Sequence, residues 1–193
     1  KSKAELSRFL LTRGLWLVFV ELVIVNFGWF FDPNFTFNPL QVIWALGVSM
    51  IALAALIHLP GKLILVIGLA ILFGHNLLDD IVLEENSFKA FLWAALHEPM
   101  QFEFMDRGFR TNYPVLPWIG IMSLGYSLGS LYDKGIVPDL RRKYLLIIGC
   151  TAILLFIVIR ASNLYGDYSK WAVQKDILFT IMSFINTSKY PPT

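Results

Sequence analysis

The chain has 193 residues, of which 56% are hydrophobic and 16% are charged, and its mean hydropathy is +0.62. A soluble domain carries about 25% charged residues, so the composition excludes an ordinary soluble globule and indicates an integral membrane protein. The net charge of +2 excludes the strongly basic surface of a nucleic-acid-binding protein. The single cysteine, Cys150, excludes a disulfide framework, and the three dispersed histidines match no metal-binding motif.

Five apolar stretches are expected to cross the bilayer, because a spanning helix needs about 20 mostly apolar residues. In chain order they are residues 9–31, 41–59, 62–78, 115–132 and 144–160. The predicted fold class is therefore an all-α, polytopic membrane helical bundle that forms a single domain over residues 1–193. Pro60 and Gly61 separate the second stretch from the third and predict a tight helical hairpin.

Two connecting segments are too long to be simple turns. The first contains FKAFLWAALH (Phe88–His97), and the C-terminal segment contains DILFTIMSFIN (Asp176–Asn186). Each is too short to cross the bilayer, so we expect two interfacial or re-entrant helices, with Trp93 at headgroup level. His97 is not part of an HExxH metal motif, because the second histidine is missing.

The distribution of lysine and arginine favours a cytoplasmic position for the N-terminal end of the chain. In that orientation the densely basic loop over residues 133–143 is also cytoplasmic, and the loop over residues 79–113 lies outside. The chain starts without methionine, so we expect further spans to be missing on one or both sides.

Three polar residues lie within the first predicted span. Ionisable side chains at a span's centre cost about 3 kcal/mol and usually face protein or water. Arg13 lies about one turn into the span; it can either snorkel to the interface or bind the phosphates of an anionic ligand. Glu21 lies deeper and requires a partner on another helix, or protonation. Asn26 can form a hydrogen bond between helices.

The third predicted span ends in FGHNLLDD (Phe73–Asp80). His75 and Asp79 are four residues apart, so on an α-helix they share one face, and Asn76 and Asp80 share the adjacent face. A carboxylate one turn from a histidine can fix its tautomer and raise its basicity, as general-base chemistry requires. The alternative is a helix end whose polar side chains simply meet water.

Three segments together resemble one family. They are SRFLLTRGLWLVFVELVIVNFGW, then LQVIWALGVSMI followed by FGHNLLD, and finally YPVLPWIGIMSLGYSLG with NTSKYPP beyond it. This pattern resembles the bacterial branch of the heparan-α-glucosaminide N-acetyltransferase catalytic-domain family, which is grouped with the transmembrane acyltransferases. The resemblance implies transfer of an acetyl or acyl group from a cytosolic CoA donor to the amine or hydroxyl of an extracytoplasmic sugar-type acceptor, here in a bacterial cytoplasmic membrane.

The family's catalytic histidine lies near its first span, upstream of Lys1, so no residue of this chain inherits that role, and residues 1–193 alone are expected to be inactive. His75 and Asp79 would assist removal of the acceptor's proton, while Arg13, Arg141 and Arg142 would bind the CoA phosphates. Substrate contacts are expected from polar and aromatic side chains: Glu21, Asn26, Trp44, Asn76, Tyr113, Trp118, Lys189 and Tyr190.

The expected partners are the lipid bilayer, acetyl-CoA or another acyl-CoA as co-substrate, and a saccharide or glycan acceptor. We expect no tightly bound cofactor, metal or nucleic acid, and self-association into a homo-oligomer stays open. The rival interpretation is a multi-span transporter or proton-coupled permease, because polar groups inside spans mark proton and substrate pathways equally well.

Overall fold

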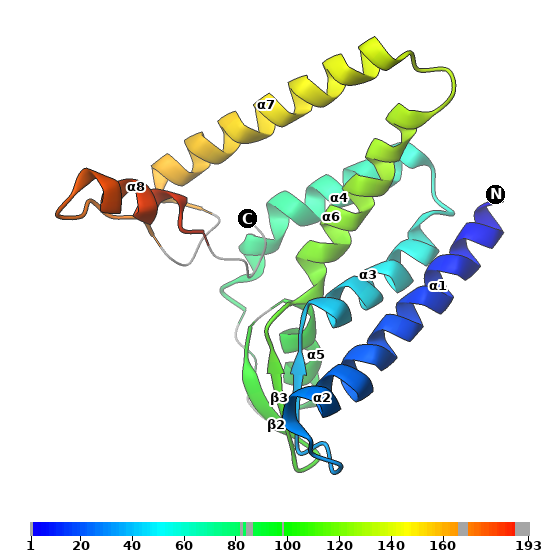
Figure 1. Ribbon diagram of the computed structural model, residues 1–193, viewed down its shortest axis with the longest axis vertical. Helices are drawn as coiled ribbons and strands as arrows, with labels where there is room; N and C mark the ends of the chain where they lie inside the picture. The colour runs from blue at the N-terminus through cyan, green and yellow to red at the C-terminus, as the bar shows by residue number, and fades with distance from the viewer. Residues whose placement is uncertain (1, 82, 84–86, 98, 166–169, 188–193) are drawn as a thin grey trace. The chain divides into compact units, whose positions relative to one another are not determined.

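The computed structural model describes residues 2–81, 83, 87–97, 99–165 and 170–187 (Figure 1). Helices account for 69% of the chain and strands for 7%, which confirms the predicted all-α class. The chain divides into two compact units, Lys1–Ser127 and Leu128–Thr193.

The first unit combines long helices with a small sheet and one short helix. Its elements are α1 (Lys3–Phe19), η1 (Val20–Val25), α2 (Asn26–Phe30), β1 (Phe37–Leu40), α3 (Val42–Leu56), α4 (Gly61–Gly74), η2 (His75–Leu78), α5 (Phe88–Leu96), β2 (Gln101–Phe104), β3 (Arg107–Thr111) and α6 (Val115–Leu128). Helix η1 is a single π-helical stretch inside one continuous helix, and η2 is a 3₁₀ extension of α4.

Within the described residues, four helical segments are long and apolar enough, by length and composition, to cross a membrane. They are Lys3–Phe30, Gly61–Leu78, Val115–Tyr132 and Pro138–Ser162. The apolar stretch expected at residues 41–59 forms α3, which has only 15 residues and is shorter than these four.

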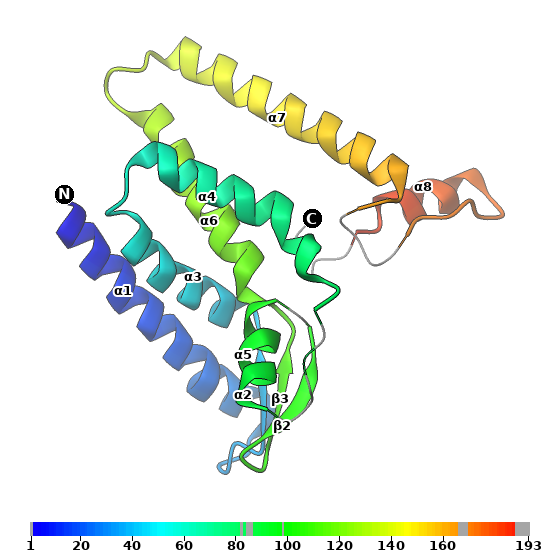
Figure 2. The same ribbon diagram turned by 180° about the vertical axis from the view of Figure 1, so that it is seen from behind.

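Helices α1 and α3 lie side by side and antiparallel, as both views show (Figures 1 and 2). At one end Lys3 Nζ donates to the carbonyl of Leu59 at 3.2 Å. Further along, a Cβ atom on Gly14 would lie 2.6 Å from the carbonyl oxygen of Gly47, and one on Gly47 would lie 2.8 Å from that of Gly14. Small residues at an interface let two helix backbones approach closely, so this glycine pair sets the separation of α1 and α3.

Helices α4 and α6 also meet through glycines. A Cβ atom on Gly68 would lie 3.2 Å from the carbonyl oxygen of Gly120, and one on Gly120 would lie 3.2 Å from that of Gly68. Both helix pairs of the first unit therefore use small residues where hydrophobic side chains alone would hold the backbones apart.

A three-stranded sheet of order β1–β3–β2 is a feature that the sequence patterns did not predict. Strand β1 pairs in parallel with β3, and β2 pairs antiparallel with β3. Helix α5, which corresponds to the expected short helix at Phe88–His97, packs on the sheet through Phe91, whose ring lies 5.2 Å from that of Phe102 and 5.6 Å from that of Phe109.

The parallel pairing of β1 with β3 places the starts of two long helices together. Strand β1 leads directly into α3 and β3 leads into α6, and the amide of Asn112 donates to the carbonyl of Leu40 at 3.0 Å. The sheet therefore lies at the end of the first unit opposite the contact between Lys3 and Leu59 (Figure 1).

The second unit consists of η3 (Gly129–Tyr132), α7 (Pro138–Ser162) and α8 (Ile177–Ile185). Arg160, near the end of α7, is buried and donates to the carbonyls of Ser183, Phe184 and Asn186 at 3.2, 2.9 and 3.0 Å. A cation there satisfies the unpaired carbonyls at the C-terminal end of α8. This contact gives a structural role to a charged residue at the end of a predicted span.

Candidate functional site

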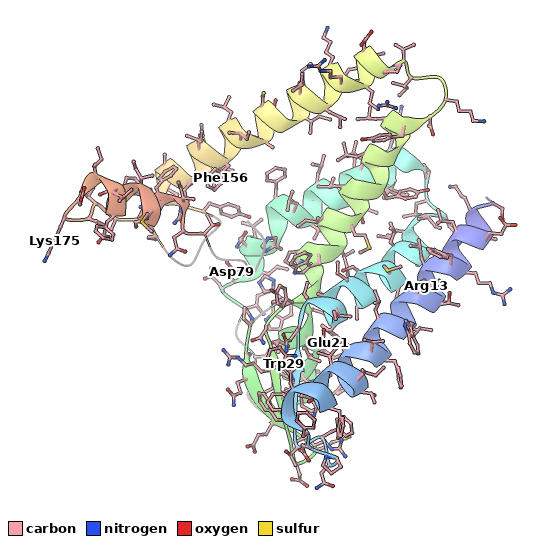
Figure 3. The ribbon with its side chains drawn as sticks, in the orientation of Figure 1. Arg13, Glu21, Trp29, Asp79, Phe156 and Lys175 are labelled. Carbon is pink, nitrogen blue, oxygen red and sulfur yellow. The ribbon has the colours of Figure 1, made fainter. Side chains whose placement is uncertain are left out.

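The polar core of the candidate site is a contact between Asp79 and His97. Asp79 follows η2, His97 follows α5, and His97 Nε2 lies 2.9 Å from Asp79 Oδ1. The side chain of His97 is 2% exposed and that of Asp79 is 27% exposed. A carboxylate only accepts hydrogen bonds, so the proton is assigned to Nε2 and the lone pair to Nδ1. Figure 3 shows Asp79 where the chain leaves the α4 segment for the sheet.

The predicted pairing of His75 with Asp79 was wrong. The prediction assumed an α-helix, but the helix tightens to 3₁₀ geometry over His75–Leu78. With three residues per turn, side chains three apart share a face, so Asn76 Nδ2 meets Asp79 Oδ2 at 3.2 Å. The ring nitrogens of His75 have no hydrogen-bond partner among the described residues, and it is His97 that contacts the carboxylate.

His75 nevertheless belongs to the same cluster. Its ring centroid lies 6.1 Å from that of His97. The ring centroid of Trp93 lies 5.0 Å from that of His97. Trp93, expected at headgroup level, thus packs on a site residue. We call His75, Asn76, Asp79, Trp93 and His97 the histidine cluster.

Several polar atoms of the histidine cluster are buried without a hydrogen-bond partner in the described part of the chain. They are both ring nitrogens of His75, Nδ1 of His97 and Nε1 of Trp93. An unsatisfied buried donor or acceptor costs about 1–3 kcal/mol, and such groups in a folded protein call for an explanation such as a catalytic role, a water or a ligand. Among the residues that the structure describes, no group of three side chains that could hold a metal ion is found.

Glu21 lies in a different setting, inside the π-helical turn η1. Its side chain is 1% exposed, and Oε2 accepts hydrogen bonds from the amides of Ile43 and Trp44 at 2.9 and 3.1 Å. These amides belong to the first turn of α3, where helix geometry leaves N–H groups unpaired. The partner on another helix that the sequence required is therefore the N-terminal backbone of α3.

Asn26 also makes a contact that ties elements together. Its Nδ2 donates to Asn38 Oδ1 at 2.7 Å, and Asn38 Nδ2 donates to the carbonyl of Phe35 at 2.8 Å. Asn26 therefore joins the end of the first long helix to strand β1 rather than to another helix.

Three aromatic candidates lie at the starts of α3 and α6, which the sheet holds at the same end of the first unit. Trp44 and Trp118 each have a buried indole Nε1 with no partner among the described residues. The ring of Tyr113 lies 5.7 Å from that of Trp118. A stacking role toward substrate remains a prediction for these residues.

The basic candidates lie apart from the histidine cluster in sequence and in their contacts. Arg13 is exposed, with its guanidinium carbon 5.6 Å from the ring centroid of Phe9. Arg141 lies 4.8 Å from the ring of Tyr132 within the second unit, and Arg142 is exposed. Lys189 and Tyr190 lie outside the described residues, so their predicted substrate contacts are not addressed by the structure.

His97 is the site residue that the sequence did not reveal. It belongs to no HExxH motif, because no second histidine follows at that spacing, and its partner Asp79 lies 18 residues earlier. The signal available was weak: a histidine immediately after a short apolar helix that returns the chain toward the end of the preceding span.

The comparisons with known proteins agree with the resemblance. The family model described as heparan-alpha-glucosaminide N-acetyltransferase, catalytic, matches residues 2–160. No curated protein and no solved structure matches the chain. The matched range contains the whole histidine cluster, Glu21 and the long helices of the first unit. The chain therefore belongs to the heparan-alpha-glucosaminide N-acetyltransferase catalytic family, a family of membrane acyltransferases.

Proposed function

We propose that this protein is a membrane-embedded acyltransferase of a bacterial cytoplasmic membrane. It moves an acetyl or acyl group from a cytosolic CoA thioester to an amine or hydroxyl of an extracytoplasmic saccharide. The observation that carries the proposal is the family match over residues 2–160, which includes three of the four span-length helices and most of the fourth.

The arrangement of the first unit supports a reaction in which donor and acceptor bind at opposite ends of the unit. Lys3 and Arg8 lie on the starting turns of α1, at the end where Lys3 contacts Leu59. The histidine cluster and the sheet lie at the opposite end. If the N-terminal end is cytoplasmic, as the basic residues favour, the donor meets the first end and the acceptor meets the histidine cluster.

For the donor side we propose the basic contacts predicted from the sequence. Arg13 lies on the cytoplasmic half of α1 in this orientation, where a guanidinium can bind phosphate oxygens in pairs. Arg141 and Arg142, near the start of α7, are the other proposed donor contacts. Replacing Arg13 with glutamine is expected to raise the apparent Michaelis constant for acetyl-CoA, while an unchanged constant would remove Arg13 from the donor site.

The decisive experiment places donor and acceptor on opposite sides of a bilayer. The full-length protein is reconstituted into liposomes that contain glucosamine, and radiolabelled acetyl-CoA is added outside. Recovery of labelled N-acetylglucosamine inside the vesicles supports the proposal, with protein-free liposomes as the control. Uptake of label without any modified sugar would contradict it and favour the proton-coupled permease.

A further inference from the structure

We infer that His97 is the general base that accepts the proton of the acceptor's nucleophile, and that Asp79 is the residue that positions it. This inference rests on the proposed function. It adds a catalytic residue within this chain, and its role is separate from that of the upstream histidine that the resemblance implies.

Asp79 fixes the orientation and the tautomer of the His97 ring. The 2.9 Å contact between Nε2 and Asp79 Oδ1 holds the proton on Nε2, which leaves Nδ1 as the only nitrogen of the neutral ring that can accept a proton. A carboxylate on the far nitrogen also stabilises the positive charge that the ring acquires when it accepts one. The same division of labour operates in other acyl-transfer sites, where a carboxylate orients the catalytic imidazole.

The polar atoms His97 Nδ1 and Trp93 Nε1 are free to bind an acceptor. Nδ1 of His97 is buried and has no partner in the described part of the chain, and the same is true of Nε1 of Trp93, which is a donor only. His97 Nδ1 and Trp93 Nε1 thus offer one lone pair and one N–H. A hydroxyl or amine complements that set, because it supplies one X–H and one lone pair.

His75 is less suited than His97 to act as the base. Its two ring nitrogens have no partner among the described residues, so nothing there fixes which nitrogen carries the proton. His75 lies edge-on to His97 with ring centroids 6.1 Å apart. It can supply an N–H or a lone pair to a bound acceptor, but no carboxylate in the described part of the chain is hydrogen-bonded to it.

The proposed step balances as follows. The acceptor nitrogen or oxygen attacks the thioester carbonyl carbon, its X–H proton passes to His97 Nδ1, and the new C–N or C–O bond forms. The C–S bond then breaks, and the leaving CoA sulfur takes a proton, which returns the imidazole to its neutral form. No oxidant, reductant or metal ion is required.

The test uses chemical rescue in the liposome assay. His97→Ala is expected to lower kcat by at least about 100-fold, since general-base catalysis contributes about 10²–10⁴-fold. Added imidazole is expected to restore part of the rate, whereas pyrazole, which has the same shape and is a much weaker base, is not. His58→Ala is the matched control, because His58 is an exposed histidine at the opposite end of the first unit.

The outcomes separate this inference from the proposed function. If the unmodified protein transfers no label, the proposed function fails whatever the variants do. If it transfers label and His97→Ala does so equally well, only the role of His97 fails. Equal rescue by imidazole and pyrazole would also overturn the inference, because filling the space would then suffice. His97→Gln provides a second variant should the alanine variant not fold, and it is expected to lose the same activity.

Discussion

Two carboxylates in the first unit, those of Glu21 and Asp79, occupy environments that differ in one decisive way. Glu21 accepts hydrogen bonds from two backbone amides of α3. Asp79 is satisfied by side chains, and the neighbouring histidines and tryptophan keep buried atoms without partners among the described residues. We therefore expect Glu21 to stabilise the fold and Asp79 to act in the proposed chemistry.

The largest effect on activity is expected from Asp79→Asn. The amide no longer holds the proton on Nε2 of His97, so we expect kcat to fall by about 100-fold or more while the thermal unfolding midpoint changes little. Asp80→Asn is the matched control, because Asp80 is the adjacent exposed acid. Equal losses of activity in the two variants would remove the distinction between Asp79 and an ordinary surface carboxylate.

Glu21→Ala is expected to act on stability instead. It leaves the amides of Ile43 and Trp44 without an acceptor, at about 1–3 kcal/mol each. Glu21→Gln keeps a side-chain oxygen and is expected to lose less than half as much, as measured by thermal unfolding in detergent. If Glu21→Gln instead abolished turnover at unchanged stability, the substrate contact predicted from the sequence would be supported. The proposed contrast between a structural Glu21 and a functional Asp79 would then be wrong.

Gly47→Ala is expected to lower the unfolding free energy by about 1–3 kcal/mol, as overpacking typically does. Its Cβ would lie 2.8 Å from the backbone oxygen of Gly14, which cannot move without shifting α1. Gly125→Ala serves as the control, since a Cβ there meets no described atom within 4 Å. Similar unfolding midpoints for the two variants would show that α1 and α3 can separate at little cost.

The smallest effect is expected at Asp32, in the loop before β1. The hydroxyl and then the amide of Thr36, with the amide of Asn34, hold the pKa of this carboxyl below its usual value. A depressed pKa contributes stability that is present above about pH 4 and is lost as the pH falls further. Asp32→Asn is therefore expected to destabilise the loop at neutral pH but not near pH 2, as hydrogen exchange of the Thr36 amide can show. A difference that grows on acidification would contradict this sign.

The membrane helices could be predicted from the sequence because apolar length is a local property. The sheet could not be predicted, because its strands have only four or five residues. In addition, β1 contains Pro39, and proline is favoured at the first position of a helix. The pairing of His75 with Asp79 failed for a related reason: four-residue spacing implies a shared face only if the helix stays α-helical, and the tightening at His75 leaves no mark in the sequence.

The contact of His97 with Asp79 could not be predicted, because no sequence motif links two residues that lie 18 positions apart. Asp79 follows the α4 segment, whereas His97 follows α5, which packs on the sheet through Phe91. Long-range contacts of this kind depend on tertiary structure. By contrast, the need of Glu21 for a partner on another helix followed directly from its depth in an apolar span.

The parallel pairing of β1 with β3 has a consequence for how the protein is made. Phe37 pairs with Gly108, about 70 residues later in the chain. At a synthesis rate of about 5–20 residues per second, β1 leaves the ribosome roughly 3–14 s before its neighbour exists. The edge of β1 stays without this partner while α3 and α4 are synthesised, so we expect the sheet to form only after both helices have been made.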